Sequence, residues 1–204
     1  TSPAVQEQLR VAEPDFGVLL DDMVVPDGAT IPRDQLLQPR VEAEIAFVLG
    51  SDLAEGPLDR EQVRAAVDYA VAALEIVDSR IVGWDITISD TVADNASSGM
   101  FVLGTNHLSL EEFKPVDATM TLLVNGAEVS RGSGAECLGD PLLALQWLAL
   151  RHREYGTPLR RGHVVLSGAL GRMTAVVDAV GRTEITAEVN PLGTVSVTLV
   201  GGGS

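Results

Sequence analysis

Two glutamates separated by one residue are the first feature of this sequence that could do chemistry. Glu42 and Glu44 lie in the run Arg40-Val41-Glu42-Ala43-Glu44-Ile45, in which charged and apolar residues alternate. This period of two is typical of a β-strand, on which residues i and i+2 point to the same face. Neighbouring carboxylates raise each other's pKa unless a cation lies between them. The pair therefore indicates either a cation site or a solvated strand face on which Arg40 offsets one charge.

A third glutamate, Glu75, favours the cation site. It lies between Ala70-Val71-Ala72-Ala73-Leu74 and Ile76-Val77, a setting too apolar for a solvated carboxylate. A buried glutamate is rare unless it is paired or bound to a metal ion, so the alternative is a salt bridge to Arg80 or Arg40. Three carboxylates suit a hard divalent cation such as Mg²⁺ or Mn²⁺. No thiolate cluster or paired-histidine spacing indicates zinc.

The other reactive side chains give weaker signals. The histidines His107, His152 and His163 are scattered, and each is expected to be a surface or hydrogen-bonded residue. Cys137 has no activating neighbour in the sequence and is expected to pack in the core. The Gly132-Ser133-Gly134 turn lacks the helix context of a phosphate loop, and no Gly-x-Ser-x-Gly or Walker pattern is present.

The composition indicates one globular domain. The chain has 204 residues, of which 46% are apolar, enough for one core. Its net charge of −15, from 29 acidic and 14 basic residues, disfavours nucleic acid as a partner. No apolar stretch of about 20 residues and no secretory signal is visible, so no membrane partner is expected. A single cysteine rules out an internal disulfide and favours a cytoplasmic enzyme.

The expected secondary structure places the glutamates on two strands, Gln38–Leu49 and Leu74–Val77. Between them a helix is expected from Asp59, as N-cap, to about Ala72, with Gln62 completing a capping box. A polar stretch from Ser89 to Gly99 is expected to form a long loop. The other expected elements are a strand at Ala118–Val124 with a hairpin turn at Asn125-Gly126, a helix from Asp140-Pro141 to Gly156, and strands at Val164–Leu166, Met173–Val177, Glu184–Val189 and Thr194–Val200.

Strands around a few flanking helices, without βαβ alternation, predict an α+β fold with a mainly antiparallel sheet or barrel-like roll. The first 200 residues are expected to form a single catalytic domain, and residues 201–204, with their Gly/Ser composition, a flexible tail.

Six segments occur in order across nearly the whole chain: EPDFG at 13–17, QPRVEAEIAF at 38–47, LEIVDSR at 74–80, DTVADNASSG at 90–99, LGDP at 138–141 and LSGALG at 166–171. Together they resemble the 2-keto-4-pentenoate hydratase family, which shares its fold with the fumarylacetoacetate hydrolases. The combination of Glu-x-Glu with Glu-x-x-Asp-Ser-Arg is specific, although either motif alone is weak. The resemblance implies a fumarylacetoacetase C-terminal domain-like fold.

The resemblance also implies roles for individual residues. Glu42, Glu44 and Glu75 would be the metal ligands, and Asp15 would belong to the catalytic apparatus. Asn95, Ser97 and Ser167 are expected to make polar contacts to substrate, although each also fits a turn-forming role.

The family's catalytic lysine would precede the segment that aligns with Thr1-Ser2, and it is not in this chain. Roughly 60 N-terminal residues of a typical member are therefore expected to be missing here.

The implied activity is hydration of a 2-hydroxy-2,4-dienoate, from aromatic or steroid ring cleavage, to a 4-hydroxy-2-oxo acid. Three alternatives stay open: a 4-oxalocrotonate decarboxylase, a C–C hydrolase of the fumarylacetoacetate type, and a non-enzymatic assembly subunit. The expected partners are the small 2-oxo or 2-hydroxydienoic acid, further copies of the chain, and a downstream aldolase-dehydrogenase.

Overall fold

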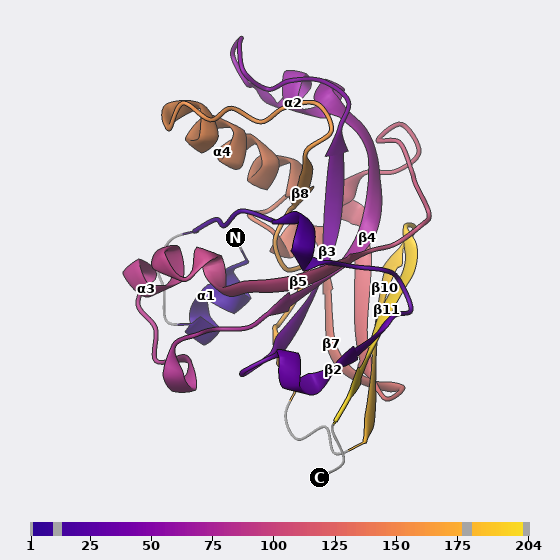
Figure 1. Ribbon diagram of the computed structural model, residues 1–204. Coiled ribbons are helices and arrows are strands. Elements are labelled where there is room, and N and C mark those ends of the chain that lie inside the picture. The colour runs from indigo at the N-terminus through magenta and orange to yellow at the C-terminus, as the bar shows by residue number, and fades with distance from the viewer. Residues whose placement is uncertain (1, 10–13, 177–180, 202–204) are drawn as a thin grey trace.

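The chain folds into two β-sheets that pack face to face, with short helices around them (Figure 1). The structure, a computed structural model, describes residues 2–9, 14–176 and 181–201. The core lies between the sheets, where Ile45 and Phe47 from one sheet and Ile185 and Val197 from the other are fully or almost fully buried. The first sheet thus has one face in the core and another turned away from it.

Among the described residues, the first sheet holds six strands in the order β1-β5-β4-β3-β8, with β9 also paired to β3. The second sheet, counted over the same residues, has five strands in the order β2-β11-β10-β6-β7. The pairings are antiparallel except β1 with β5 and β2 with β11, which confirms the α+β expectation of mainly antiparallel sheets. The strands are β1 (Val24–Val25), β2 (Thr30–Pro32), β3 (Arg40–Leu49), β4 (Val67–Val77), β5 (Ser98–Leu103), β6 (Thr119–Val124), β7 (Ala127–Ser133), β8 (Val164–Leu166), β9 (Thr174–Ala175), β10 (Arg182–Asn190) and β11 (Gly193–Val200).

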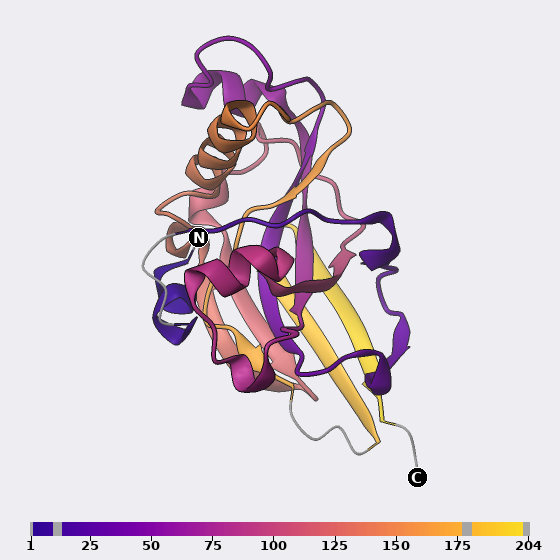
Figure 2. The same cartoon turned by 60° about the vertical axis from the view of Figure 1, so that its left-hand side comes forward.

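In the described part of the chain, four α-helices surround the sheets: α1 (Pro3–Leu9), α2 (Arg60–Ala66), α3 (Ile88–Ala93) and α4 (Pro141–Glu154). In Figures 1 and 2, α1 and α3 lie on the side of the first sheet opposite to β10 and β11. The start of α4 is as expected, since the Asp140 carboxylate accepts a hydrogen bond from the Leu142 amide and Pro141 occupies the first turn. Within the described residues, no helix combines the length and apolar character needed to cross a bilayer.

The helix expected to run to Ala72 ends at Ala66, so that prediction was wrong over its second half. Asp59 does cap it, but the Gln62 side chain bonds to Leu58 and Glu55 instead of completing a capping box. Residues Val67–Val77 form β4, which pairs with β3 along nearly its whole length. The alanines of this segment fit a helix or a strand, and the long ladder with β3 selects the strand.

The long loop expected at Ser89–Gly99 was also wrong. Thr87 and Asp90 form a capping box that starts α3, and β5 begins at Ser98. The strand expected at Met173–Val177 is reduced to β9, while Val177 lies outside the described residues. The other expected strands, the Asn125-Gly126 turn and the long helix are confirmed within a few residues.

Candidate active site

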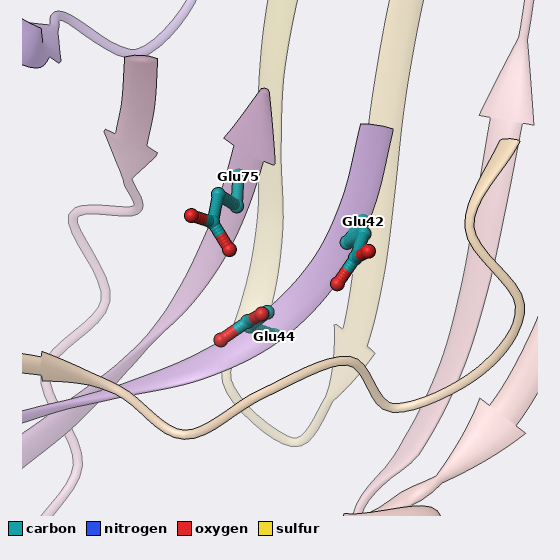
Figure 3. Close-up of side chains that lie close together, drawn as sticks. All are labelled: Glu42, Glu44 and Glu75. Carbon is teal, nitrogen blue, oxygen red and sulfur yellow. The ribbon is translucent and has the colours of Figure 1, made fainter. Parts of the chain in front are cut away.

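Glu42, Glu44 and Glu75 converge on the face of the first sheet that is turned away from the core. Glu42 and Glu44 lie two residues apart on β3, and Glu75 on β4 is directly opposite Glu42 in the antiparallel register. One carboxylate oxygen from each lies within 4.8 Å of the others (Figure 3). The strand alternation that predicted the pair is therefore confirmed, and the register of β4 adds the third member.

These carboxyl groups are shielded from water, and their electrostatics are unfavourable in the absence of a cation. Glu42 is 7% exposed and Glu44 1%, while Glu75 is partly buried. Burial, together with the charge of Glu75, raises the pKa of Glu42 to about 8. Burial and the charges of Glu75 and Glu42 raise the pKa of Glu44 well above its usual value. Burial also raises the pKa of Glu75, against the opposing effect of the Ser98 hydroxyl.

The polar partners of the cluster orient the carboxylates without neutralising them. The Gly168 amide donates a 2.6 Å hydrogen bond to Glu44 Oε2, and the Ser98 hydroxyl donates one of 2.8 Å to Glu75 Oε1. Neither donor carries a positive charge, so neither offsets the repulsion among the three carboxylates.

Neither arginine considered as a salt-bridge partner pairs with Glu75. Arg80 pairs with Asp94 and donates to the Ser98 carbonyl, and the Arg40 guanidinium lies 4.2 Å from the centre of the Trp84 ring. Among the described residues, no ion pair involves any of the three glutamates. Three carboxylate oxygens this close together, with no ion-pair partner among the described residues, fit a hard divalent metal ion.

The glutamates form part of the wall of a cavity of about 640 Å³. Asp15 also lines it, and its charge raises the pKa of both Glu42 and Glu75 after the larger effect of burial. The structure thus brings Asp15 to the carboxylate cluster from a segment that is distant in sequence.

The segment that carries Asp15 is held from two sides. The Phe16 ring lies 5.9 Å from that of Trp147 and 5.0 Å from that of His152, both on α4. Asn95 holds the other side, because its side-chain amide donates to the Val18 carbonyl and its Oδ1 accepts from the Val18 amide. Gly17 allows this approach, since a Cβ there would lie 2.4 Å from the Asn95 carbonyl oxygen.

Asn95 therefore has a positioning role that the sequence did not indicate, and a direct contact with substrate stays a prediction. Its amide is committed to Val18, and it does not line the cavity. Asn95, Ala96 and Ser97 all have φ near +55°, at 59°, 54° and 54°, a conformation that costs free energy in non-glycine residues. This turn sets Asn95 against Val18 and leads directly into Ser98.

Ser97 and Ser167 do line the cavity, as their expected contacts with substrate require. The Ser97 hydroxyl donates to Asp94, and the Ser167 hydroxyl makes a long hydrogen bond of 3.4 Å to the Gly168 carbonyl. The buried Cys137 thiol donates to the Ser167 carbonyl at 2.9 Å, so Cys137 packs beneath the site, as expected.

Two of the three histidines are surface or hydrogen-bonded residues, as expected, but they also line the cavity, which the sequence did not indicate. His152 from α4 and His163 from the segment before β8 both line the cavity. His152 Nδ1 lies 3.0 Å from the Thr157 carbonyl oxygen, which fixes the ring beside Phe16. They are 11 residues apart on two different elements, and only the fold brings them together.

The chain matches the family described as fumarylacetoacetate (FAA) hydrolase C-terminal over residues 3–200. It is 54% identical over 176 residues to a 2-keto-4-pentenoate hydratase of Burkholderia vietnamiensis strain G4, covering 86% of this chain and 67% of that one. It is 41% identical over 196 residues to a 2-hydroxyhexa-2,4-dienoate hydratase of Comamonas testosteroni, covering 91% and 74%. The chain thus spans about two thirds to three quarters of these relatives.

A solved structure is also similar: 4-oxalocrotonate decarboxylase from Pseudomonas putida G7, complexed with magnesium and adipate. The TM-score is 0.90 at 34% identity, over 98% of this chain and 75% of that one. The similarity to this decarboxylase therefore covers nearly the whole fold of the chain.

The stability of the chelated protein should depend on pH in a direction set by Glu42. Its pKa is near 4.5 in the unfolded chain and about 8 in the folded one, so the folded state binds more protons between these values. Stability is therefore expected to fall as pH rises from about 4.5 through about 8. Thermal melting in a chelator across this range measures the effect.

Added Mg²⁺ should raise the melting temperature increasingly as pH rises, since a bound cation relieves the repulsion between carboxylates. In Glu44→Gln, which removes one charge, the pH slope in chelator should be shallower. A melting temperature that rises with pH in chelator would contradict this interpretation of the cluster.

Replacing Asn95 with glycine should release the segment around Asp15. Glycine keeps the positive φ at this position and removes only the amide that holds Val18. Loss of a hydrogen bond worth about 1 kcal/mol predicts roughly fivefold faster exchange of the Val18 amide. The matched control is Asn125→Gly, another left-handed asparagine (φ 50°), whose side chain bonds Glu184 instead. Equal Val18 exchange in both variants would refute the positioning role.

Proposed function

Because the chain belongs to the fumarylacetoacetate hydrolase family, we propose that it is a metal-dependent hydro-lyase acting on a 2-hydroxy-2,4-dienoate. Water adds to the 2-oxo-3-enoate tautomer of this acid to give a 4-hydroxy-2-oxo acid, in the breakdown of aromatic or steroid rings. The observation that carries the proposal is the cluster of three glutamate oxygens within 4.8 Å, without an ion-pair partner among the described residues. The hydratase names of relatives at 54% and 41% identity support the reaction type.

Glu42, Glu44 and Glu75 would hold Mg²⁺ or Mn²⁺ beside the cavity. When bound, such an ion supplies Lewis acidity, which stabilises negative charge on a substrate oxygen by several kcal/mol. The Gly168 amide and the Ser98 hydroxyl keep two of the carboxylates in place through hydrogen bonds. Orienting groups of this kind support metal affinity, since the ligands need no rearrangement on binding.

Asp15 is the proposed proton-transfer group. The reaction requires a proton at C5 as the dienol becomes a ketone, and another at C3 after water adds at C4. A carboxyl group in the same cavity as the substrate can deliver or accept such protons. Its support is its place in the cavity wall and its electrostatic effect on Glu42 and Glu75.

The second candidate reaction is decarboxylation of 4-oxalocrotonate, in which the same cation would stabilise the negative charge left by departing carbon dioxide. The similarity to the decarboxylase, at TM-score 0.90, is the observation that favours it. The hydratases have the higher sequence identity, which ranks hydration first.

Three further expectations stay predictions: a cytoplasmic location, self-association, and contact with an aldolase-dehydrogenase that would consume the product. Direct substrate contacts by Ser97 and Ser167 belong with them, supported by the presence of both residues in the cavity wall.

Glu44→Gln should lower metal-dependent hydration at least about 100-fold, because a neutral amide is a poor ligand for a hard cation. The fold should persist, since glutamine keeps an oxygen that can accept the Gly168 amide hydrogen. The assay follows the ultraviolet loss of 2-hydroxypenta-2,4-dienoate, and in parallel of 4-oxalocrotonate, after chelation and addition of Mg²⁺. Glu128→Gln, on exposed β7, is the control and should match the parent chain.

Normal activity of Glu44→Gln under these conditions would refute the assignment of Glu44 as a metal ligand. Faster consumption of 4-oxalocrotonate than of the dienoate by the parent chain would favour the decarboxylase. No turnover of either acid would favour the non-enzymatic alternative.

Asp15→Asn should slow turnover about 100-fold while leaving Mg²⁺ affinity within roughly threefold of the parent, since general acid-base groups contribute on that scale without holding the metal. Steady-state kinetics measures the turnover, and calorimetric titration with Mg²⁺ measures the metal affinity. A variant that loses metal binding and turnover together would place Asp15 among the ligands instead.

A further inference from the structure

The sheet face that carries the glutamates becomes apolar directly beyond them. Residues of adjacent strands lie in rows across the sheet, and successive rows on one face are about 7 Å apart. The row of Glu44 continues through Ala73 on β4 to Leu103 on β5. The next row consists of Leu166 on β8, Ala46 on β3 and Val71 on β4. A ligand held at the carboxylates therefore has hydrocarbon within one row of its anchored end.

Two leucines, with Val164, bring this apolar region to the cavity wall. Ala46, Val71 and Ala73 are at most 1% exposed and form a small cluster of their own, against which Leu103 and Leu166 pack. Both leucines line the cavity. The small alanines beneath them leave room for the leucine side chains, which meet the cavity from strands on either side of β3 and β4.

In the opposite direction along β3 the sheet face carries a cation, but the cavity does not meet it. Arg40 occupies the row before Glu42, between Val77 and Ala175. Its guanidinium lies 4.2 Å from the Trp84 ring centre, and it is Trp84 that lines the cavity. Among the described residues of the cavity wall there is no lysine or arginine. A second anionic group on a ligand would therefore meet carboxylates, hydroxyls, histidines or apolar side chains among the described residues, and no lysine or arginine.

We propose that Leu103 and Leu166 form a subsite for an uncharged hydrocarbon chain end, and that this subsite selects monocarboxylic 2-oxo acids against dicarboxylic ones. The inference rests on the proposed function, because it assumes that the 2-oxo acid end lies at the glutamates. Burial of alkyl groups against the leucines favours binding by the hydrophobic effect. A terminal carboxylate against the two leucines would lose hydration without gaining a lysine or arginine partner among the described residues.

The test is calorimetric titration of the Mg²⁺-loaded chain with saturated 2-oxo acids, which bind without a double bond to hydrate. Affinity should rise about threefold to fourfold for each added methylene from 2-oxopentanoate through 2-oxohexanoate to 2-oxoheptanoate. The decisive pair is 2-oxohexanoate and 2-oxoadipate, which have six-carbon backbones and differ by a terminal methyl or carboxylate group. The dicarboxylate should bind at least roughly 30-fold more weakly.

Variants connect this preference to the two leucines. Leu103→Ala and Leu166→Ala should each reduce the affinity for 2-oxoheptanoate about tenfold while changing that for pyruvate less than twofold, because pyruvate has no chain to reach the subsite. Leu108→Ala is the matched control: this leucine is also partly buried but packs against the main core, outside the cavity wall. It should change neither affinity. Circular dichroism and thermal melting establish that each variant is folded.

The possible failures are distinguishable. Equal affinity for 2-oxohexanoate and 2-oxoadipate, with both bound only in the presence of Mg²⁺, would overturn the hydrocarbon subsite and leave the proposed function standing. An unchanged chain-length dependence in folded Leu103→Ala and Leu166→Ala would likewise overturn the assignment to these residues. Absence of Mg²⁺-dependent binding by every 2-oxo acid would overturn the proposed function and this inference with it.

Discussion

The repulsion among three closely spaced carboxylates, two of them buried and one partly buried, is the constraint on which the site depends. Glu42 and Glu75 face each other across a strand pair, and Glu44 is the next residue along the same face. Their pKa values are raised chiefly because the sheet and the cavity walls exclude water. A protein without a use for this charge would gain stability by replacing any one of them. The cluster is therefore best understood as one half of an interaction that a cation completes.

The neighbouring loops and strands can be understood from this constraint. The turn at residues 95–97 takes three left-handed residues in succession and leads into Ser98, which bonds to Glu75. The same turn holds Val18 through Asn95, and α4 holds Phe16 through its aromatic side chains. The segment that carries Asp15 is thus held beside the carboxylate cluster by Asn95 at Val18 and by α4 at Phe16. The backbone strain at this turn accompanies the placement of two functional segments beside each other.

The sequence predicted those features whose signals are local. The Asp140-Pro141 start of α4, the Asn125-Gly126 turn and the i, i+2 pair on β3 each follow from a few adjacent residues. Glu75 was accessible too, because a charge in an apolar run is conspicuous. The resemblance to a known family contributed Asp15, which no local pattern indicated.

Features that depend on distant contacts were missed. The boundary between α2 and β4 falls in an alanine-rich segment whose propensities do not separate helix from strand, and pairing with β3 decides it. His152 and His163 line one cavity only because the last turn of α4 and the start of β8 both lie beside it. The hydrogen bond between Asn95 and Val18 could not be seen in the sequence, because the two residues are 77 positions apart.

The alternation along β3 has a consequence for how such an enzyme can change over evolutionary time. Val41, Ala43, Ile45 and Phe47 point into the core, while Glu42 and Glu44 line the cavity and Ala46 lies buried on their face of the sheet. Alternate residues of the ten-residue strand β3 therefore serve core packing and the cavity face. Substitutions at the even-numbered positions can change which ligands bind, while the odd-numbered positions keep the core packing unchanged. A single strand can thus change its ligand contacts while its core-facing side chains keep the same packing.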